Sequence, residues 1–172
     1  MKATMKHMPV TGYHRFKNAK AMMDIRLFSL FKVQYQAGKE MDISETVTFF
    51  NDMCCMAPAT LIDKRIQWLK TEGNKVKASF SSNGITISAW LYFNSRGELI
   101  NFVSDDRYAA GIKNKMQRMQ WSTPLKDHKM FNGYKLPGYA DTIYHYPAGD
   151  LCYGNFRLVN VEYNCRPMNN IL

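Results

Sequence analysis

Hydrophobic and polar residues alternate along most of this chain, but one stretch has the spacing of an α-helix instead. In residues 42–56 an apolar side chain recurs about every three or four positions, which places these side chains on one helical face. The face consists of Ile43, Val47, Phe50, Cys54 and Ala57, widened by Thr46, Phe49, Met53 and Met56. We therefore predict an amphipathic helix that lies on a sheet.

The ends of this helix carry their own signals. Asp42 and Glu45 have the spacing of a capping box, so the helix is predicted to begin at Asp42. Pro58 lacks an N–H group and disfavours helix in the residue before it, so the helix is predicted to end there. Cys54 falls on the apolar face and Cys55 on the polar face. We expect Cys54 to be buried and Cys55 to be accessible.

The rest of the chain has the period of β-strands. Residues 19–36 alternate, although Phe28 and Leu30 interrupt the polar face, and they predict one long, half-solvated strand. Asn83-Gly84 is a strong signal for a hairpin turn, because both residues tolerate positive φ. Residues 105–108, Asp-Asp-Arg-Tyr, are predicted to leave their strand and enter a loop. Further strands are predicted at residues 65–71, 75–81, 85–93, 99–104, 115–125, 134–146 and 151–163.

The order of these elements predicts the fold class. Consecutive strands usually pair as neighbours, and a sheet this wide must twist and curl. The helix is the one element able to cover its concave face. We predict an α+β fold: a curled antiparallel β-meander sheet of about seven to eight strands with one amphipathic helix packed across its concave face. The predicted organisation is a loose N-terminal arm (1–18), a single α+β domain (19–164) and a frayed tail (165–172).

Charge and cysteine content narrow the classes of partner and location. The formal net charge is +9, but the basic residues are scattered, which favours a solvated basic surface and disfavours nucleic acid. The four cysteines form no C-x-x-C pair, which indicates reduced thiols. No apolar run reaches the roughly 18–20 residues of a membrane span, and the N-terminus has no secretory signal. The chain as written is predicted to be cytoplasmic.

Residues 38–164 carry matches to a known family. They are Ala57-Pro58, Trp68, Gly97, Asp106-Arg107-Tyr108, Trp121, Asn132-Gly133 with Pro137, Pro147 with Gly149-Asp150, Tyr153 and Glu162-Tyr163-Asn164. On these residues the chain resembles the C-terminal part of an uncharacterised bacterial family, a domain of unknown function. The resemblance implies longer relatives that often begin with membrane segments, which this chain lacks. The sequence leaves open whether the chain is a truncated form, and a membrane-associated location is expected only if a longer N-terminal part is missing. The family has no established activity, so no catalytic residue is implied.

The residues themselves indicate no catalytic chemistry. The histidines have no metal-ligand spacing, and no nucleophile elbow, Walker loop or Rossmann glycine pattern is present. We predict no catalytic residue, no metal and no cofactor. Arg107 is a candidate for gripping a carboxylate or phosphate, and Trp90, Tyr92, Trp121 and Tyr144 are candidates for an aromatic ligand platform. The alternative is structural: an Arg–Asp pair fixes the loop, and the rings pack in the core.

The predicted architecture and the candidate residues leave two functions open. The first is a non-enzymatic binding domain, in which a partly apolar cavity under the helix holds a lipid-like or other hydrophobic molecule. That expectation rests on analogy with curled-sheet carriers. The alternative is an interaction module that docks a protein, an anionic membrane surface or nucleic acid through its basic face or an open sheet edge. The strand at residues 19–36, if unpaired, also predicts a weak homodimer. An enzyme ranks third.

Overall fold

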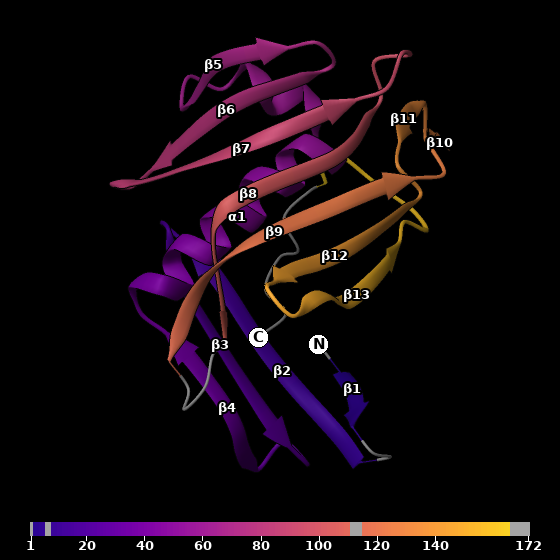
Figure 1. Cartoon of the computed structure of the whole chain (residues 1–172). Coiled ribbons are helices and arrows are strands. Elements are labelled where there is room, and N and C mark those ends of the chain that lie inside the picture. Colours follow the sequence, from indigo (N-terminus) through magenta and orange to yellow (C-terminus); the bar gives the residue numbers. More distant parts are fainter. Residues whose placement is uncertain (1, 6–7, 111–114, 166–172) are drawn as a thin grey trace.

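The computed structural model describes residues 2–5, 8–110 and 115–165. In this part of the chain, one long helix lies between a seven-stranded and a four-stranded antiparallel sheet (Figure 1). The large sheet has the order β13-β12-β9-β8-β7-β6-β5, and the N-terminal sheet has the order β1-β2-β3-β4. Neither the large sheet nor the N-terminal sheet closes on itself. The predicted α+β fold is confirmed.

The large sheet is the predicted meander. Its strands are β5 (Ile66–Glu72), β6 (Lys75–Ser82), β7 (Ile85–Phe93), β8 (Leu99–Ala110), β9 (Met116–Lys126), β12 (Tyr139–Tyr146) and β13 (Gly149–Arg157). Asn83 and Gly84 join β6 to β7 with φ angles of 47° and 80°, so the hairpin falls where the sequence predicts it. A small separate hairpin of β10 (Lys129–Phe131) and β11 (Tyr134–Leu136) interrupts the meander between β9 and β12.

The hydrophobic core lies between the helix α1 (Lys39–Met56) and the concave face of the large sheet. Phe50 is fully buried at its centre. Its ring stacks on Phe80 with centroids 5.3 Å apart and meets Phe102 edge-on at 5.7 Å. Phe102 in turn meets Trp121 edge-on at 6.2 Å. This aromatic chain fills the space under the helix where the sequence predicts an apolar cavity.

The N-terminal sheet replaces two predicted features. Residues 8–17, predicted as part of a loose arm, form β2 (Met8–Lys17), which pairs with β1 (Lys2–Met5) and β3 (Lys20–Leu27). The long strand predicted at residues 19–36 is two strands, β3 and β4 (Phe31–Ala37), joined by a tight turn. Phe28 and Ser29 make this turn with φ angles of 50° and 62°. The prediction failed because this turn lacks the glycine or asparagine that usually marks such a conformation.

The start of α1 also differs from the prediction. The helix begins at Lys39, after Gly38 with a φ of 107°, and no side chain caps it. Asp42 lies inside the helix and is buried, where its carboxylate accepts hydrogen bonds from the Ala21 backbone N–H (2.8 Å) and the Lys20 ammonium (2.7 Å). The N-terminal sheet therefore covers the polar side of α1. Cys55, predicted to be accessible on that side, is buried as well as Cys54.

Strand β8 continues through residues 105–108, where the sequence predicts a loop. A β-bulge lies between Ser104 and Arg107: three steps along β8 oppose two steps along β9, from Trp121 to Met119. The bulge absorbs one extra residue, so Arg107 lies on the same face of the sheet as Ser104, whereas regular alternation through all four residues would turn it to the other face. The bulge therefore directs Arg107 toward α1.

The C-terminal part returns to the helix without forming a further described strand. The short 3₁₀ helix η1 (Pro58–Ile62) follows α1, and the hydroxyl of Tyr163 donates to the Met56 carbonyl. Of the predicted tail at residues 165–172, all but residue 165 lies outside the described residues. No helix in the described part of the chain combines the length and apolarity that crossing a membrane requires.

We expect Phe50→Ala to lower the free energy of unfolding by about 3–5 kcal/mol, because it removes a fully buried ring and leaves a cavity between Phe80 and Phe102. Urea denaturation measures the loss. Phe49→Ala, on the neighbouring and partly exposed ring, is the control and should cost clearly less. Equal losses for the two variants would show that α1 is rotated relative to the large sheet.

Candidate functional site

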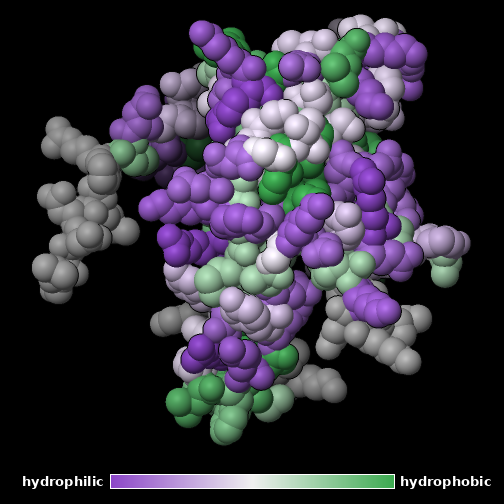
Figure 2. Space-filling view, turned by 90° about the vertical axis from the view of Figure 1, so that its left-hand side faces the viewer, coloured by the Kyte–Doolittle hydropathy of each residue, from purple (hydrophilic) through white to green (hydrophobic). Residues whose placement is uncertain are grey.

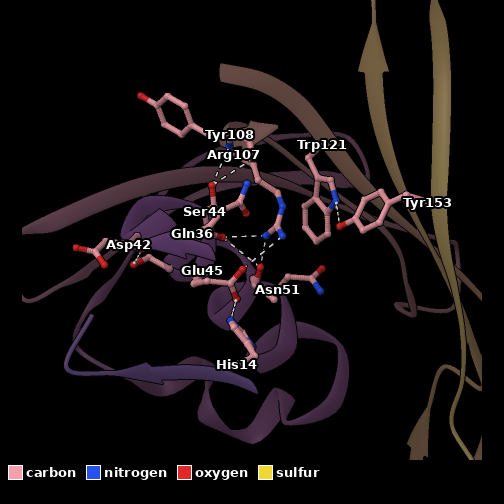
Figure 3. Close-up of polar contacts among 12 residues, drawn as sticks. His14, Gln36, Asp42, Ser44, Glu45, Asn51, Arg107, Tyr108, Trp121 and Tyr153 are labelled. Atoms are coloured by element: carbon pink, nitrogen blue, oxygen red, sulfur yellow. Dashed lines mark hydrogen bonds and ion pairs between the residues drawn. The ribbon is translucent and has the colours of Figure 1, made fainter. Parts of the chain in front are cut away.

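Arg107 lies where α1 meets the large sheet and donates hydrogen bonds to both (Figure 3). Its side chain is 11% exposed. Nε donates to the Tyr144 hydroxyl (2.9 Å), and Nη1 donates to the Ser44 carbonyl (2.9 Å) and to the Thr48 hydroxyl. These contacts join β8 to α1 and to β12.

Two aromatic rings and one carboxylate complete the surroundings of Arg107. Its guanidinium carbon lies 4.7 Å from the centroid of the Trp121 ring and 5.9 Å from that of Tyr144. Glu45 Oε1 lies 3.6 Å from Nη2. Burial alone would lower the pKa of Arg107, but the interactions with Tyr144, Tyr153 and Glu45 outweigh it, so the pKa is raised and the side chain stays charged.

The contacts of Arg107 favour the structural interpretation of this residue. Its partner Glu45 also lies 3.3 Å from His14 Nε2, so β2 of the N-terminal sheet joins the network. The Tyr144 hydroxyl in turn donates to the Tyr108 carbonyl (2.9 Å). With these donors already used inside the protein, an anion would have to displace the helix to reach the guanidinium. The predicted Arg–Asp pair is not what holds Arg107.

The five predicted ligand residues do not form one site. Trp121 and Tyr144 lie beside Arg107 on the concave face of the large sheet. Trp90 and Tyr92 alternate with the buried Ala89 and Leu91, so they lie on the opposite face.

The rings on both faces have neighbours within the protein. On the outer face, the Lys75 ammonium lies 4.5 Å from the centroid of Trp90. On the concave face, Tyr153 stacks on Tyr144 at 5.1 Å and accepts a hydrogen bond from Trp121 Nε1 (3.0 Å). Tyr153 is not among the ligand residues predicted from the sequence, because only the β12–β13 pairing brings it to these rings.

A cavity of about 290 Å³ lies at the C-terminal end of α1, away from all five predicted residues. Its lining includes a group of apolar side chains at the edge of the core: Leu61, Leu91, Phe93, Leu99 and Leu136. Charged side chains form its rim: Arg96, Glu98 and Lys135. No pattern in the sequence indicates this cavity, because its walls come from η1, β7, β8 and the β10–β11 hairpin.

The charged side chains of the rim form ion pairs with one another. Both Lys135 Nζ (2.5 Å, to Oε1) and Arg96 Nη2 (2.8 Å, to Oε2) pair with the single carboxylate of Glu98. Asn94 also donates to Glu98 Oε2 (2.7 Å). Hydrogen bonds from Lys135, Asn94 and Arg96 lower the pKa of Glu98 to about 2, so this carboxylate is ionised at neutral pH. Two cations around one anion leave the rim with an excess positive charge.

Cys54 and Cys55 lie in the wall of the cavity, but both thiols are in unreactive surroundings. Burial raises the pKa of Cys54 to about 12 and that of Cys55 well above its usual value. The thiolate, which is the reactive form, is therefore scarce at neutral pH. Cys152 and Cys165 are exposed.

A serine, a histidine and an aspartate form a chain of hydrogen bonds on the outer face of the large sheet. Ser122 Oγ is 2.8 Å from His145 Nε2, and His145 Nδ1 is 2.7 Å from Asp150 Oδ1. In a hydrolytic triad the serine faces the substrate and the aspartate is buried. Here Ser122 is 2% exposed and the Asp150 side chain is 62% exposed, so the order of burial is reversed. This chain links β9, β12 and the start of β13, and it offers no accessible nucleophile.

Comparisons with known proteins give a family and no activity. The model of a family of unknown function (DUF6544) matches residues 1–156. The match covers the N-terminal sheet as well as most of the region that carries the resemblance, and it ends before Glu162-Tyr163-Asn164. No curated protein and no solved structure matches the chain.

We expect a maleimide to label Cys152 and Cys165 in the native protein, while Cys54 and Cys55 react only after unfolding. Mass spectrometry of peptides, after labelling with and without urea, identifies the reacting thiols. Native labelling of Cys55 would contradict its burial and would support the helix orientation predicted from sequence.

Asp52 supplies a prediction about pH. Burial is the main cause that raises its pKa to about 6 from an ordinary value of 3.8, with Asn51 opposing the shift and Glu45 adding to it. Because the folded-state pKa is raised, the penalty for ionising Asp52 is absent near pH 4, develops between pH 4 and 6, and persists above that. Asp52→Asn should therefore raise the free energy of unfolding by up to about 3 kcal/mol at pH 8 and leave it nearly unchanged at pH 4.

Urea denaturation of both proteins at pH 4, 6 and 8 measures this difference. The control is Glu40→Gln, which removes an exposed carboxyl from the same helix and should shift stability by less than about 1 kcal/mol at each pH. A constant difference between Asp52→Asn and wild type across this range would contradict the raised pKa.

Proposed function

We propose that this chain, which belongs to a family of unknown function (DUF6544), is a non-enzymatic binding domain for a small amphipathic molecule with an apolar body and an anionic end. The observation that carries the proposal is the cavity at the C-terminal end of α1, with its apolar lining and its positively charged rim. The proposal keeps the hydrophobic ligand predicted from the sequence and moves its site from under the helix to the end of the helix.

The apolar part of the lining supports a hydrophobic body in the ligand. Leu91 and Leu136 are buried side chains of the core edge, and Leu61 and Leu99 pack against them. Ligand pockets are usually concave and mostly apolar, with a few polar groups that fix orientation, and start at about 300 Å³. At about 290 Å³ the cavity suits a short acyl chain or a small ring system rather than a large lipid.

The rim supports a negative charge at one end of the ligand. Arg96 and Lys135 share the one carboxylate of Glu98 and have solvent-exposed side chains. A ligand carboxylate or phosphate can therefore pair with either cation without breaking a fully buried contact. The formal net charge of +9 adds a general attraction for anions. A cytoplasmic location remains a prediction from the sequence.

Decanoate tests the proposal, because it combines an apolar chain with a carboxylate. We expect isothermal titration calorimetry to show one decanoate per protein, and Leu61→Trp to weaken binding at least about tenfold by filling the cavity. Ile62→Trp is the matched control, since Ile62 is the next residue, is 91% exposed and does not line the cavity. Lys135→Gln should weaken decanoate more than decanol, which lacks the charge.

Native mass spectrometry of the purified protein adds an independent observation, since a copurified ligand appears as added mass. Thermal melts verify that both tryptophan variants fold. Equal decanoate affinity in Leu61→Trp and wild type, or no binding by the wild type, would refute the proposed cavity function.

A further inference from the structure

The turn between β3 and β4 carries an exposed group of apolar side chains, which we call the β3–β4 tip: Phe28, Leu30, Phe31 and Val33. Leu30 is 75% exposed and Phe31 is 66% exposed. Figure 1 places this turn at the lower end of the molecule, far from the large sheet, and Figure 2 shows apolar surface gathered at that end. Exposed apolar groups of this kind mark sites of interaction.

The backbone of the tip is held in a conformation that disfavours its own side chains. Phe28 and Ser29 both have positive φ, which is uncommon for residues other than glycine and asparagine and especially for bulky ones. Hydrogen bonds from the Phe28 N–H to the Pro9 carbonyl (2.9 Å) and from the Leu30 N–H to the Leu27 carbonyl (3.1 Å) maintain the turn. The described residues of the core cluster include no side chain of the tip. The apolar residues therefore contribute little to the described fold that would explain their place here.

Next to the tip, the strands of the N-terminal sheet carry a lysine and exposed tyrosines, residue types that are common at membrane interfaces. Lys32 comes directly after Phe31, and its ammonium lies 4.9 Å from the centroid of the Tyr35 ring. Tyr13 and Tyr35 flank Asp24 in the same row of the N-terminal sheet, and both are exposed. Lysine and tyrosine side chains favour the boundary between apolar lipid and water, where an apolar part and a polar end are both satisfied.

Charge identifies the kind of membrane. Asp24 in this row is paired with Arg26 Nη2 at 2.9 Å and also interacts with Lys32, so two cations share one carboxylate behind the tip and leave an excess positive charge. The whole chain carries a formal net charge of +9. Membrane leaflets rich in anionic lipid attract such proteins, and the attraction is screened by salt.

We propose that the β3–β4 tip inserts into the interface of an anionic membrane and that the net positive charge of the protein holds it there. The tip is a narrow projecting turn rather than a flat or concave face, so it fits between lipid head groups. The proposal is independent of the ligand cavity, which lies at the C-terminal end of α1 and is lined by no residue of the tip.

Co-sedimentation with vesicles tests the proposal. Wild-type protein should bind vesicles of phosphatidylcholine with phosphatidylglycerol, bind phosphatidylcholine alone more weakly, and release at high salt. The double variant Leu30→Ser/Phe31→Ser should lower the partition coefficient at least about tenfold. The matched control is Ile62→Ser/Val159→Ser, which changes two exposed apolar residues outside the tip and should bind like wild type.

A second measurement locates the inserted residue. Leu30→Trp should add fluorescence that brominated phosphatidylcholine in the anionic vesicles quenches, above the quenching seen with the native tryptophans. Binding of the tip variant equal to wild type, absence of wild-type binding to anionic vesicles, or an unquenched tryptophan at position 30 would each overturn the proposal. A lipid-free dimer in sedimentation velocity that the tip variant abolishes would also overturn it, because the tip would then bind a second copy of the chain.

Discussion

The buried guanidinium of Arg107 needs hydrogen-bond acceptors and a counter-charge, and the elements around it must lie where they can supply them. An unpaired buried charge costs several kcal/mol, so the surrounding elements are fixed by the need to supply acceptors. Ser44 and Thr48 do so from α1, and Tyr144 does so from β12. The position of the helix along the sheet is thereby set at its N-terminal half by polar contacts, and at its C-terminal half by the aromatic packing around Phe50. Hydrophobic burial alone does not fix where the helix lies along the sheet, whereas the directional hydrogen bonds of Arg107 do.

The same helix joins the two sheets, because both of its sides are buried. Asp42 holds β3 through the Ala21 N–H, and Glu45 faces His14 on β2. Half of the N-terminal sheet is thus anchored to α1, whereas its far half carries exposed side chains. A firmly attached base and a free end are what a projecting docking element requires. The proposed ligand cavity and the proposed membrane contact share no residue, so one molecule can use both.

Periodicity predicted the parts of this fold whose side chains alternate regularly. The helix, the meander and the Asn83-Gly84 hairpin follow from local pattern and turn chemistry. The N-terminal sheet was missed, because a turn at Phe28-Ser29 has no sequence marker and the pattern continues across it. Arg107, Trp121 and Tyr144 were selected and do lie together, but as internal partners of one another. The cavity was missed, because segments distant in sequence form it and no motif spans them. Whether residues 19–164 form a single domain, and whether the chain forms a weak homodimer, remain predictions.

The β-bulge at Asp105-Asp106 shifts the alternation of inward and outward side chains along β8. Beyond it, inward and outward positions are exchanged relative to simple alternation, and both aspartates lie outside, bonded to Gln120 and Arg118. Loss of one of these residues would remove the bulge and leave regular alternation from Ser104 to Arg107, so Arg107 would still face the helix. The extra residue has its consequence on the outer face, where it places two carboxylates next to each other and a regular strand would place one.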